Sequence, residues 1–219
     1  PRPAKPPPVV DIELVATCPD PEHFPDPIGV EIAFGGRSNV GKSSLLNALA
    51  GRRRLARVSS KPGCTRRIAF YEARLQDGAR LRLVDLPGYG YARRSRTERI
   101  AWGKLVETYL VARPTLAAVV TLVDVRRGVE DDDRQLLELG RAPARVARAP
   151  VHPILVATKL DKLPRAQRKP ALARLRQQAG CRVLGFSIHD PDTADALWVE
   201  LRHQLGMAPA VASAPAGAR

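Results

Sequence analysis

Residues 36–43 have the composition of a phosphate-binding loop. They read Gly-Arg-Ser-Asn-Val-Gly-Lys-Ser and lie between an apolar, strand-like run at 30–34 and a helix-forming segment at 44–50. A loop that ends a strand and opens a helix directs successive backbone N–H groups at one point, and glycines let that backbone approach phosphate oxygens. Lys42 would place a cation at the β- and γ-phosphates, and the Ser43 hydroxyl is a suitable Mg²⁺ ligand. The alternative is a glycine-rich turn without a ligand, but the strand-loop-helix setting favours phosphate.

Two aspartates follow later apolar runs. Asp85 opens Asp-Leu-Pro-Gly after residues 81–84, and Asp161 closes Thr-Lys-Leu-Asp after residues 154–157. Open α/β sheets bind ligands at the carboxyl ends of their strands, so both carboxylates belong at one edge of a sheet. There Asp85 could hold Mg²⁺ through water, and the Gly88 N–H could reach a γ-phosphate.

Asp161 bears on the choice of base. A carboxylate accepts hydrogen bonds from N1–H and from the exocyclic amine of guanine, whereas adenine offers neither donor, and sites built on such bonds discriminate by about 10⁴ or more. Taken alone, Thr-Lys-x-Asp also fits a surface loop with a helix-capping aspartate. Because the Thr-Lys-x-Asp segment follows the phosphate loop and Asp-x-x-Gly in the expected order and spacing, it indicates GTP. An ATP-dependent small-molecule kinase would share the phosphate loop but gives no reason for Asp161.

Two further segments would complete a nucleotide site. Residues 60–65, Ser-Lys-Pro-Gly-Cys-Thr, lie between the first helix and a strand-like run at 67–75. There the Thr65 hydroxyl would complete the Mg²⁺ shell only when a γ-phosphate is present, which makes the loop a switch between ordered and disordered states; the alternative is an ordinary Pro-Gly turn. Residues 186–188, Phe-Ser-Ile, end the apolar run at 183–186 and could offer backbone N–H groups to the guanine carbonyl.

The chain resembles a known family in four segments, GRSNVGKSSLLN at 36–47, SSKPGCT at 59–65, VDLPGYGYA at 84–92 and AWGKLVETY at 101–109. These segments are similar to those of the EngB-type GTP-binding proteins, a bacterial branch of the translation-factor-like GTPases. The resemblance runs from about residue 30 to residue 205. Its most specific part is the second-switch segment, Pro-Gly-Tyr-Gly-Tyr-Ala at 87–92, together with the helix that follows. We expect Trp102 and Tyr109 of that helix to be core anchors.

The resemblance implies an α/β, Ras-like P-loop GTPase fold with a mostly parallel six-stranded sheet and helices on both faces. The alternation of strand-like and helical runs after residue 30 points to the same class. It also implies slow hydrolysis of GTP to GDP and phosphate with Mg²⁺, a role in large ribosomal subunit assembly, and a link to cell division and septation. The alternative is a GTP-dependent scaffold in septation, for which ribosome contact is incidental.

The expected nucleotide contacts come from the phosphate loop, the first-switch loop, Asp-Leu-Pro-Gly, Thr-Lys-Leu-Asp and Phe-Ser-Ile. They are Gly36, Arg37, Ser38, Asn39, Val40, Gly41, Lys42, Ser43, Gly63, Cys64, Thr65, Arg66, Arg67, Asp85, Leu86, Pro87, Gly88, Thr158, Lys159, Leu160, Asp161, Phe186, Ser187 and Ile188. The residues expected to act on the reacting phosphate are Lys42, Thr65, Asn39 and Gly88. Those expected to serve Mg²⁺ are Ser43, Thr65 and Asp85.

The expected hydrolytic machinery lacks a glutamine. Many GTPases carry one directly after the Asp-x-x-Gly glycine to orient the attacking water, but this chain has Tyr89 there, and no arginine finger can be assigned. Intrinsic turnover should therefore be slow. By resemblance to potassium-activated GTPases, Asn39 would help to bind K⁺ between the phosphates, where the ion could supply the missing charge. The alternative is that Asn39 only forms a hydrogen bond with the first switch.

Basic residues surround both expected switches in a chain of net charge +14. They are Arg52, Arg53, Arg54, Arg57, Lys61, Arg66 and Arg67 at the first switch, and Arg93, Arg94, Arg96 and Arg99 after the second. Such density beside a γ-phosphate sensor indicates a polyanionic partner engaged in the GTP state; the alternative is an arginine-rich composition with solvated side chains. Aromatic residues, at 5%, do not interleave with these clusters, which favours contact with the phosphate backbone of folded RNA over base stacking. Ribosomal RNA and large-subunit precursor particles are the expected partners.

The remaining sequence predicts the domain organisation. We expect a disordered arm at 1–8 with five prolines, one GTPase domain at 9–206 whose motif-bearing core begins near 30, and a disordered Ala/Pro-rich tail at 207–219. Residues 9–15 are a candidate additional edge strand. No apolar run reaches about 18 residues and no signal-peptide pattern is present, so we expect a cytoplasmic protein without a membrane partner. Three dispersed cysteines predict neither a disulfide nor a zinc site, and we expect a monomer.

Overall fold

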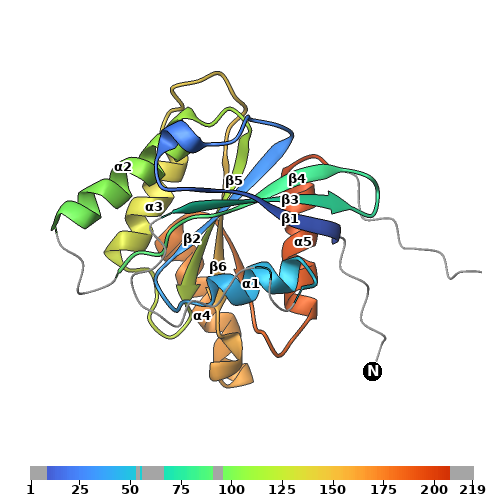
Figure 1. The fold of residues 1–219 in the computed structure, drawn as a ribbon. Helices are drawn as coiled ribbons and strands as arrows, with labels where there is room; N and C mark the ends of the chain where they lie inside the picture. The colour runs from blue at the N-terminus through green and yellow to red at the C-terminus, as the bar shows by residue number, and fades with distance from the viewer. Residues whose placement is uncertain (1–8, 53–54, 56–66, 91–95, 208–219) are drawn as a thin grey trace, which may run out of the picture.

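The computed structural model describes residues 9–52, 55, 67–90 and 96–207. Figure 1 shows a central sheet surrounded by helices. The strands are β1 (Val9–Cys18), β2 (Val30–Gly36), β3 (Ile68–Leu75), β4 (Arg80–Asp85), β5 (Leu116–Asp124), β6 (His152–Thr158) and β7 (Arg182–Gly185). The helices are α1 (Lys42–Leu49), α2 (Arg96–Ala112), α3 (Asp131–Arg141), α4 (Arg165–Ala179) and α5 (Asp192–Gln204), with short 3₁₀ turns η1 (Pro21–His23) and η2 (Leu160–Lys162).

The sheet has seven strands in the order β1-β3-β4-β2-β5-β6-β7. The five strands from β4 to β7 in this order are parallel to one another, while β1 and β3 add two antiparallel pairings. The expected α/β fold is confirmed, with one strand more than six. The extra strand is β1, which extends past the candidate at 9–15 as far as Cys18. Its length is hard to read from sequence because only three of its ten residues are buried.

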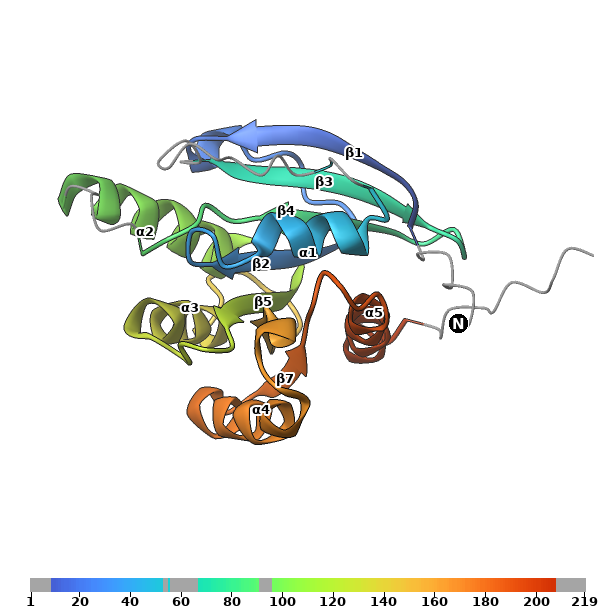
Figure 2. The ribbon, with the colours of Figure 1, turned by 90° about the horizontal axis from the view of Figure 1, so that it is seen from below.

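Helices cover both faces of the sheet. Figure 2 shows α2, α3 and α4 along one side and α5 on the other. Helix α1 packs with α5 against the same apolar cluster, and the indole N–H of Trp198 in α5 donates to the carbonyl oxygen of Leu49 at 3.0 Å. In the part of the chain described, no helix is both long and apolar enough to cross a bilayer.

The parallel strands bring the expected site to one edge. Register pairs Phe34 of β2 with Asp85 of β4, and Asp124 of β5 with Thr158 of β6. The carboxyl ends of these four strands therefore lie in a row, and the loops that follow them meet above it.

A buried polar cluster anchors α2 at the other end of the sheet. Glu31, at the start of β2, accepts hydrogen bonds from Arg113 at 2.8 and 2.6 Å and from the Tyr109 hydroxyl at 3.0 Å. Tyr109 is fully buried and Trp102 half-buried. Both are core anchors, as the sequence predicts.

Candidate nucleotide site

The phosphate loop joins β2 directly to α1. Gly41 takes a left-handed conformation, with φ of 112°, immediately before the helix begins at Lys42. Gly36 has no room for a side chain, because a Cβ there would lie 2.9 Å from Val40 Cγ1 and 3.0 Å from the carbonyl oxygen of Leu122. Glycine is thus required at both positions, at one for conformation and at the other for space. The structure has the strand-loop-helix setting that the sequence predicts.

Lys42 and Asp85 meet at the start of α1. Their side chains form an ion pair and are only 11% and 10% exposed. Ser43 follows Lys42 in the first helical turn, so a cation, a hydroxyl and a carboxylate gather where the loop would hold phosphate. Hard oxygen donors of this kind suit Mg²⁺, which keeps several waters and binds through one or two protein oxygens plus phosphates. Among the described residues, no group of three or more acidic, histidine or cysteine side chains is arranged to hold a metal ion by itself.

The expected guanine-selecting segments lie side by side. The Ser187 hydroxyl donates to the Asp161 carboxylate at 2.9 Å, and the Leu160 N–H donates to the Phe186 carbonyl oxygen at 3.1 Å. Desolvation raises the pKa of Asp161, but the hydrogen bond from Ser187, a hydrogen bond from its own backbone N–H and the nearby Lys162 charge together outweigh it and hold that pKa below its usual value. The carboxylate is therefore ionised and orientated at neutral pH. The side chain of Ile188, by contrast, is 63% exposed.

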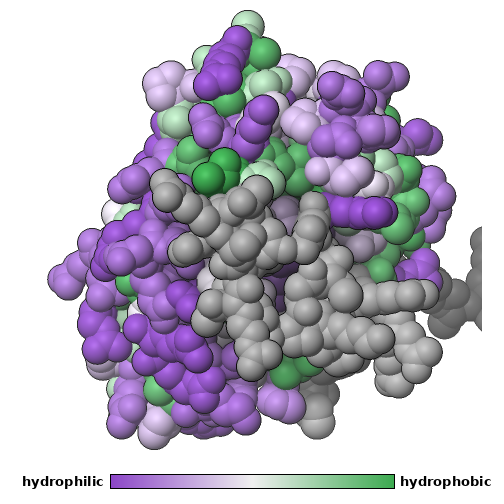
Figure 3. Space-filling view, turned by 60° about the vertical axis from the view of Figure 1, so that its left-hand side comes forward, coloured by the Kyte–Doolittle hydropathy of each residue, from purple (hydrophilic) through white to green (hydrophobic). Residues whose placement is uncertain are grey.

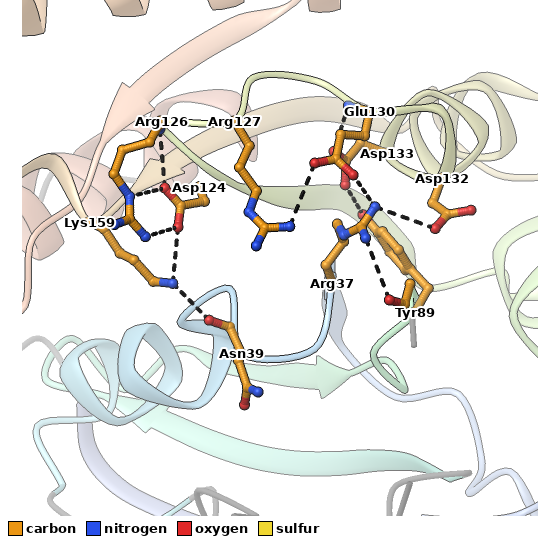
Figure 4. Close-up of polar contacts among 11 residues, drawn as sticks. Arg37, Asn39, Tyr89, Asp124, Arg126, Arg127, Glu130, Asp132, Asp133 and Lys159 are labelled. Atoms are coloured by element: carbon orange, nitrogen blue, oxygen red, sulfur yellow. Dashed lines mark hydrogen bonds and ion pairs between the residues drawn. The ribbon is translucent and has the colours of Figure 1, made fainter. Parts of the chain in front are cut away.

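Thr158 and Lys159 connect this base-binding end to the phosphate loop. The Thr158 hydroxyl lies 2.6 Å from the carbonyl oxygen of Val40. Lys159 takes a left-handed conformation, with φ of 58°, and its ammonium group donates to the carbonyl oxygen of Asn39 at 2.9 Å. In Figure 4 this contact uses the backbone of Asn39, whose side chain points away from it. The two halves of the site therefore form one hydrogen-bonded unit.

Asp124 is a site residue that the sequence reasoning missed. Its carboxylate pairs with Lys159 at 3.0 Å and receives two hydrogen bonds from the Arg126 guanidinium, at 2.9 and 2.7 Å (Figure 4). The Arg126 hydrogen bond is the largest influence on the Asp124 pKa and lowers it well below its usual value. Asp124 stands at the end of an apolar strand just as Asp85 does. That position in the sequence is the signal by which Asp124 could have been recognised as a site residue.

The start of the second switch lies against the phosphate loop. The Ser38 N–H donates to the Tyr89 carbonyl oxygen at 3.0 Å, and the Tyr89 N–H donates to the Gly36 carbonyl oxygen at 3.4 Å. A Cβ at Gly88 would lie 3.2 Å from the Ser38 hydroxyl. Gly88 thus stands beside the phosphate loop, where the sequence places it.

The Tyr89 side chain points away from this loop. It is 3% exposed, its hydroxyl donates to Asp133 of α3 at 2.7 Å, and its ring packs edge-on against Trp102, 5.5 Å between centroids. The Trp102 indole N–H in turn donates to the Pro87 carbonyl oxygen at 2.7 Å. Burial, followed by the nearby Asp133 charge, raises the pKa of Tyr89 well above its usual value. The residue in the glutamine position is therefore a neutral anchor between the second switch and two helices.

Arg37 makes a second connection to α3. Its guanidinium forms an ion pair with Glu130, lies 3.8 Å from Asp132 and reaches the Gly90 carbonyl oxygen at 3.5 Å (Figure 4). Glu130 is also the N-cap of α3, where its backbone N–H donates to Asp133 at 2.9 Å in a capping box. A cleft of about 380 Å³ opens between this group, the phosphate loop and the loop that follows β5.

Several expected site residues lie outside the described residues, namely Gly63, Cys64, Thr65 and Arg66. Arg67 is described and lies exposed just before β3. Of the expected basic clusters, Arg53, Arg54, Arg57, Lys61, Arg93 and Arg94 also lie outside, and the side chains of Arg96 and Arg99 are not described. The roles assigned to these residues stay predictions.

Comparison with known proteins establishes the family. A family model described as 50S ribosome-binding GTPase matches residues 31–159. The probable GTP-binding protein EngB of Myxococcus xanthus is 40% identical over 204 residues, which cover 90% of this chain and 96% of that protein. The chain belongs to the EngB family of GTP-binding proteins. As a GTPase of this family, it binds GTP and hydrolyses it to GDP and phosphate.

Other EngB proteins agree. The probable EngB of Anaeromyxobacter dehalogenans is 43% identical over 201 residues, covering 88% of this chain and 90% of its own. A crystal structure of a probable GTP-binding protein EngB superposes with a TM-score of 0.60 at 21% identity, covering 81% of this chain and 99% of that one. At that identity the superposition supports the Ras-like fold alone.

Proposed function

We propose that this EngB-family protein is a GTP-controlled switch that acts in assembly of the large ribosomal subunit. The observation that carries the proposal is the direct pairing of the phosphate loop with the start of the second switch, through the hydrogen bonds between Ser38, Gly36 and Tyr89. A change at the γ-phosphate would reach residues 90–99 without an intermediate element. That segment contains Arg93, Arg94, Arg96 and Arg99, so the nucleotide state would control a basic surface.

In this proposal the nucleotide lies along the row of strand ends. The backbone of residues 36–43 and Lys42 bind its phosphates, Gly88 contacts the γ-phosphate, and Asp161 with Ser187 selects guanine. Ser43 and Thr65, with Asp85 through water, hold Mg²⁺, which would neutralise phosphate charge. The meeting of Lys42, Ser43 and Asp85 supports this assignment.

Hydrolysis would be slow without a partner, because the buried Tyr89 hydroxyl is engaged by Asp133 rather than available to orient water. Asn39 would compensate by helping to bind K⁺ at the phosphates. The exposure of the Asn39 side chain supports this role, since it can reach an ion at the phosphates while Lys159 holds its backbone.

The proposed partners are ribosomal RNA and precursors of the large subunit. The net charge of +14 and the 50S ribosome-binding description of the matching family model support them. Figure 3 shows a face on which hydrophilic side chains prevail and apolar ones form separate patches, which suits a polar partner. We further propose a cytoplasmic monomer linked to cell division and septation. A septation scaffold with incidental ribosome contact is the competing proposal.

Co-sedimentation with large-subunit precursors distinguishes the two proposals. The switch proposal expects tight association with a non-hydrolysable GTP analogue, much weaker association with GDP, and a steep decrease as salt rises, because phosphate contacts release counterions. Association that is equal in both nucleotides and insensitive to salt would contradict it.

A further inference from the structure

Helix α4 carries many charged side chains, and all of them are positive. Its 15 residues contain five cations, Arg165, Arg168, Lys169, Arg174 and Arg176, and no carboxylate. Within the described part of the chain, no ion pair joins any of these five to an acidic residue. The neighbouring helix α3 is built differently, since it begins with three consecutive aspartates. The positive charge of α4 is therefore not compensated within the helix.

Three of these cations form a row along one flank of the helix. Arg165, Lys169 and Arg176 are exposed, and their spacing of four and seven residues places them on one side over about 16 Å. Leu172 belongs to the same row and lies against Gly185 of β7, where an added Cβ would be 3.5 Å from Leu172 Cδ1. The row therefore runs along the β7 edge of the sheet.

The opposite flank of α4 is occupied. Gln178 accepts a hydrogen bond from the Val129 N–H at 3.4 Å, and Arg141 of α3 donates to the Ala179 carbonyl oxygen at 2.6 Å. Ala171 and Leu175 are buried against the core. Because the apolar face of α4 is already packed, the helix has none left to insert into a membrane surface.

This row is far from the switches. β7 is the last strand of the sheet, whereas the two switch segments flank β3 and β4 in its other half. Figure 2 shows α4 and β3 at opposite ends of the molecule. Helix α4 packs mainly on β6 and β7 rather than on β3 or β4, so its position should not depend on the γ-phosphate.

The chemistry of the row identifies its partner class. Like charges four residues apart, as at Arg165 and Lys169, destabilise an isolated helix, and a polyanion would relieve that repulsion. Residues 165–179 contain no aromatic side chain, so bases would not stack there and the contact would be to phosphates.

We propose that Arg165, Lys169 and Arg176 form a second RNA-binding surface, which contacts the phosphate backbone of folded RNA in both nucleotide states. This inference rests on the proposed ribosomal role and adds a second RNA contact on another part of the molecule. The switch surface would bind RNA only with GTP, while the α4 row would hold RNA throughout the cycle.

The test compares two triple variants of the whole chain. The first is Arg165→Glu/Lys169→Glu/Arg176→Glu. The control is Arg74→Glu/Arg80→Glu/Arg145→Glu, which changes net charge equally at exposed positions on β3, on β4 and after α3. Both are titrated against a fluorescently labelled double-stranded RNA hairpin with bound GDP, after circular dichroism and GDP affinity have shown that they are folded.

We expect the α4 variant to lose affinity for the hairpin by about tenfold or more, and its log–log salt slope to fall by about 2 to 3, near 0.9 per lost phosphate contact. The control should stay within about twofold. A glutamine triple variant, which removes the charges without reversing them, should show a smaller loss in the same direction.

Two outcomes would overturn the inference. They are parental affinity of the α4 variant for the hairpin and an equal loss of affinity in the control. Parental hairpin affinity combined with loss of particle association would indicate that the row contacts a protein instead. Co-sedimentation of the parent with GTP analogue tests the proposed function separately. If the parent failed to sediment with particles while the hairpin result held, the ribosomal role would be wrong and the RNA surface would remain.

Discussion

The substitution Tyr89→Phe tests whether this tyrosine is an anchor or a participant in hydrolysis. It removes one hydroxyl and leaves a ring that can still pack against Trp102. The lost hydrogen bond is 2.7 Å long and joins groups that are 3% and 1% exposed, so Asp133 would retain a buried carboxylate oxygen without this donor. Such a loss costs about 1 to 3 kcal/mol, or roughly 2 to 12 °C in melting temperature for a domain of this size.

The cost should depend on pH in a stated direction. Burial is the main influence on Asp133 and raises its pKa, while the hydrogen bond from Tyr89 lowers it and so favours the ionised carboxylate. The stabilisation by this bond is therefore present where Asp133 is ionised and is lost as pH falls through its folded-state pKa. Chemical denaturation of parent and Tyr89→Phe at pH 7 and pH 4 should show the larger difference at pH 7. In an Asp133→Asn background the difference should shrink at both pH values.

Hydrolysis provides the second readout. Because the hydroxyl faces α3, single-turnover GTP hydrolysis by folded Tyr89→Phe should stay within about threefold of the parent, a barrier change below about 0.7 kcal/mol. A loss of tenfold or more with unchanged stability would place the hydroxyl in the hydrolytic step and refute the anchor assignment.

Three other predictions concern the base, the switch and the cation. Asp161→Asn should shift preference from guanine toward xanthine nucleotides, since an amide donates to a carbonyl oxygen where the carboxylate accepted from an amine; competition binding that still favours guanine would place the base elsewhere. Reversing Arg93, Arg94 and Arg96 to Glu should leave GTP affinity within a few-fold but abolish particle association, and equal association at low salt would refute the RNA contact. Replacing K⁺ by Na⁺ at constant ionic strength should slow hydrolysis about tenfold or more, and Asn39→Ala should remove that difference; equal rates in both salts would contradict the cation role.

The local parts of the site were predictable from sequence. The phosphate loop depends on the backbone conformation of Gly41 and on the space available at Gly36. Both glycines belong to the sequence motif, so the loop can be recognised without the structure. The contact between Asp161 and Ser187 was implied because each residue follows an apolar run, and neighbouring parallel strands bring such residues to one edge.

The contacts that couple the loops were not predictable. Arg37 and Glu130 are 93 residues apart in sequence, and Tyr89 and Asp133 are 44 apart. No periodicity links such pairs, because they depend on how α3 is placed against β2 and β4. The buried position of Tyr89 is the clearest example, since its place after Gly88 suggests a role at the phosphate and its side chain lies elsewhere.

β1 illustrates a different limit. Its pairing with β3 has two register shifts, and most of its residues are exposed. An edge strand with one partner requires no regular apolar alternation, so its end at Cys18 could be read only from the fold.

The central claim is that GTP directs a basic switch surface onto ribosomal RNA, and a structure of the GTP-analogue complex with large-subunit precursors, at side-chain resolution, tests it most directly. We predict that residues 93–99 contact phosphates of large-subunit RNA while Asp161 holds guanine. A complex in which these residues face solvent or a septation protein, with no RNA near the switches, would contradict the account.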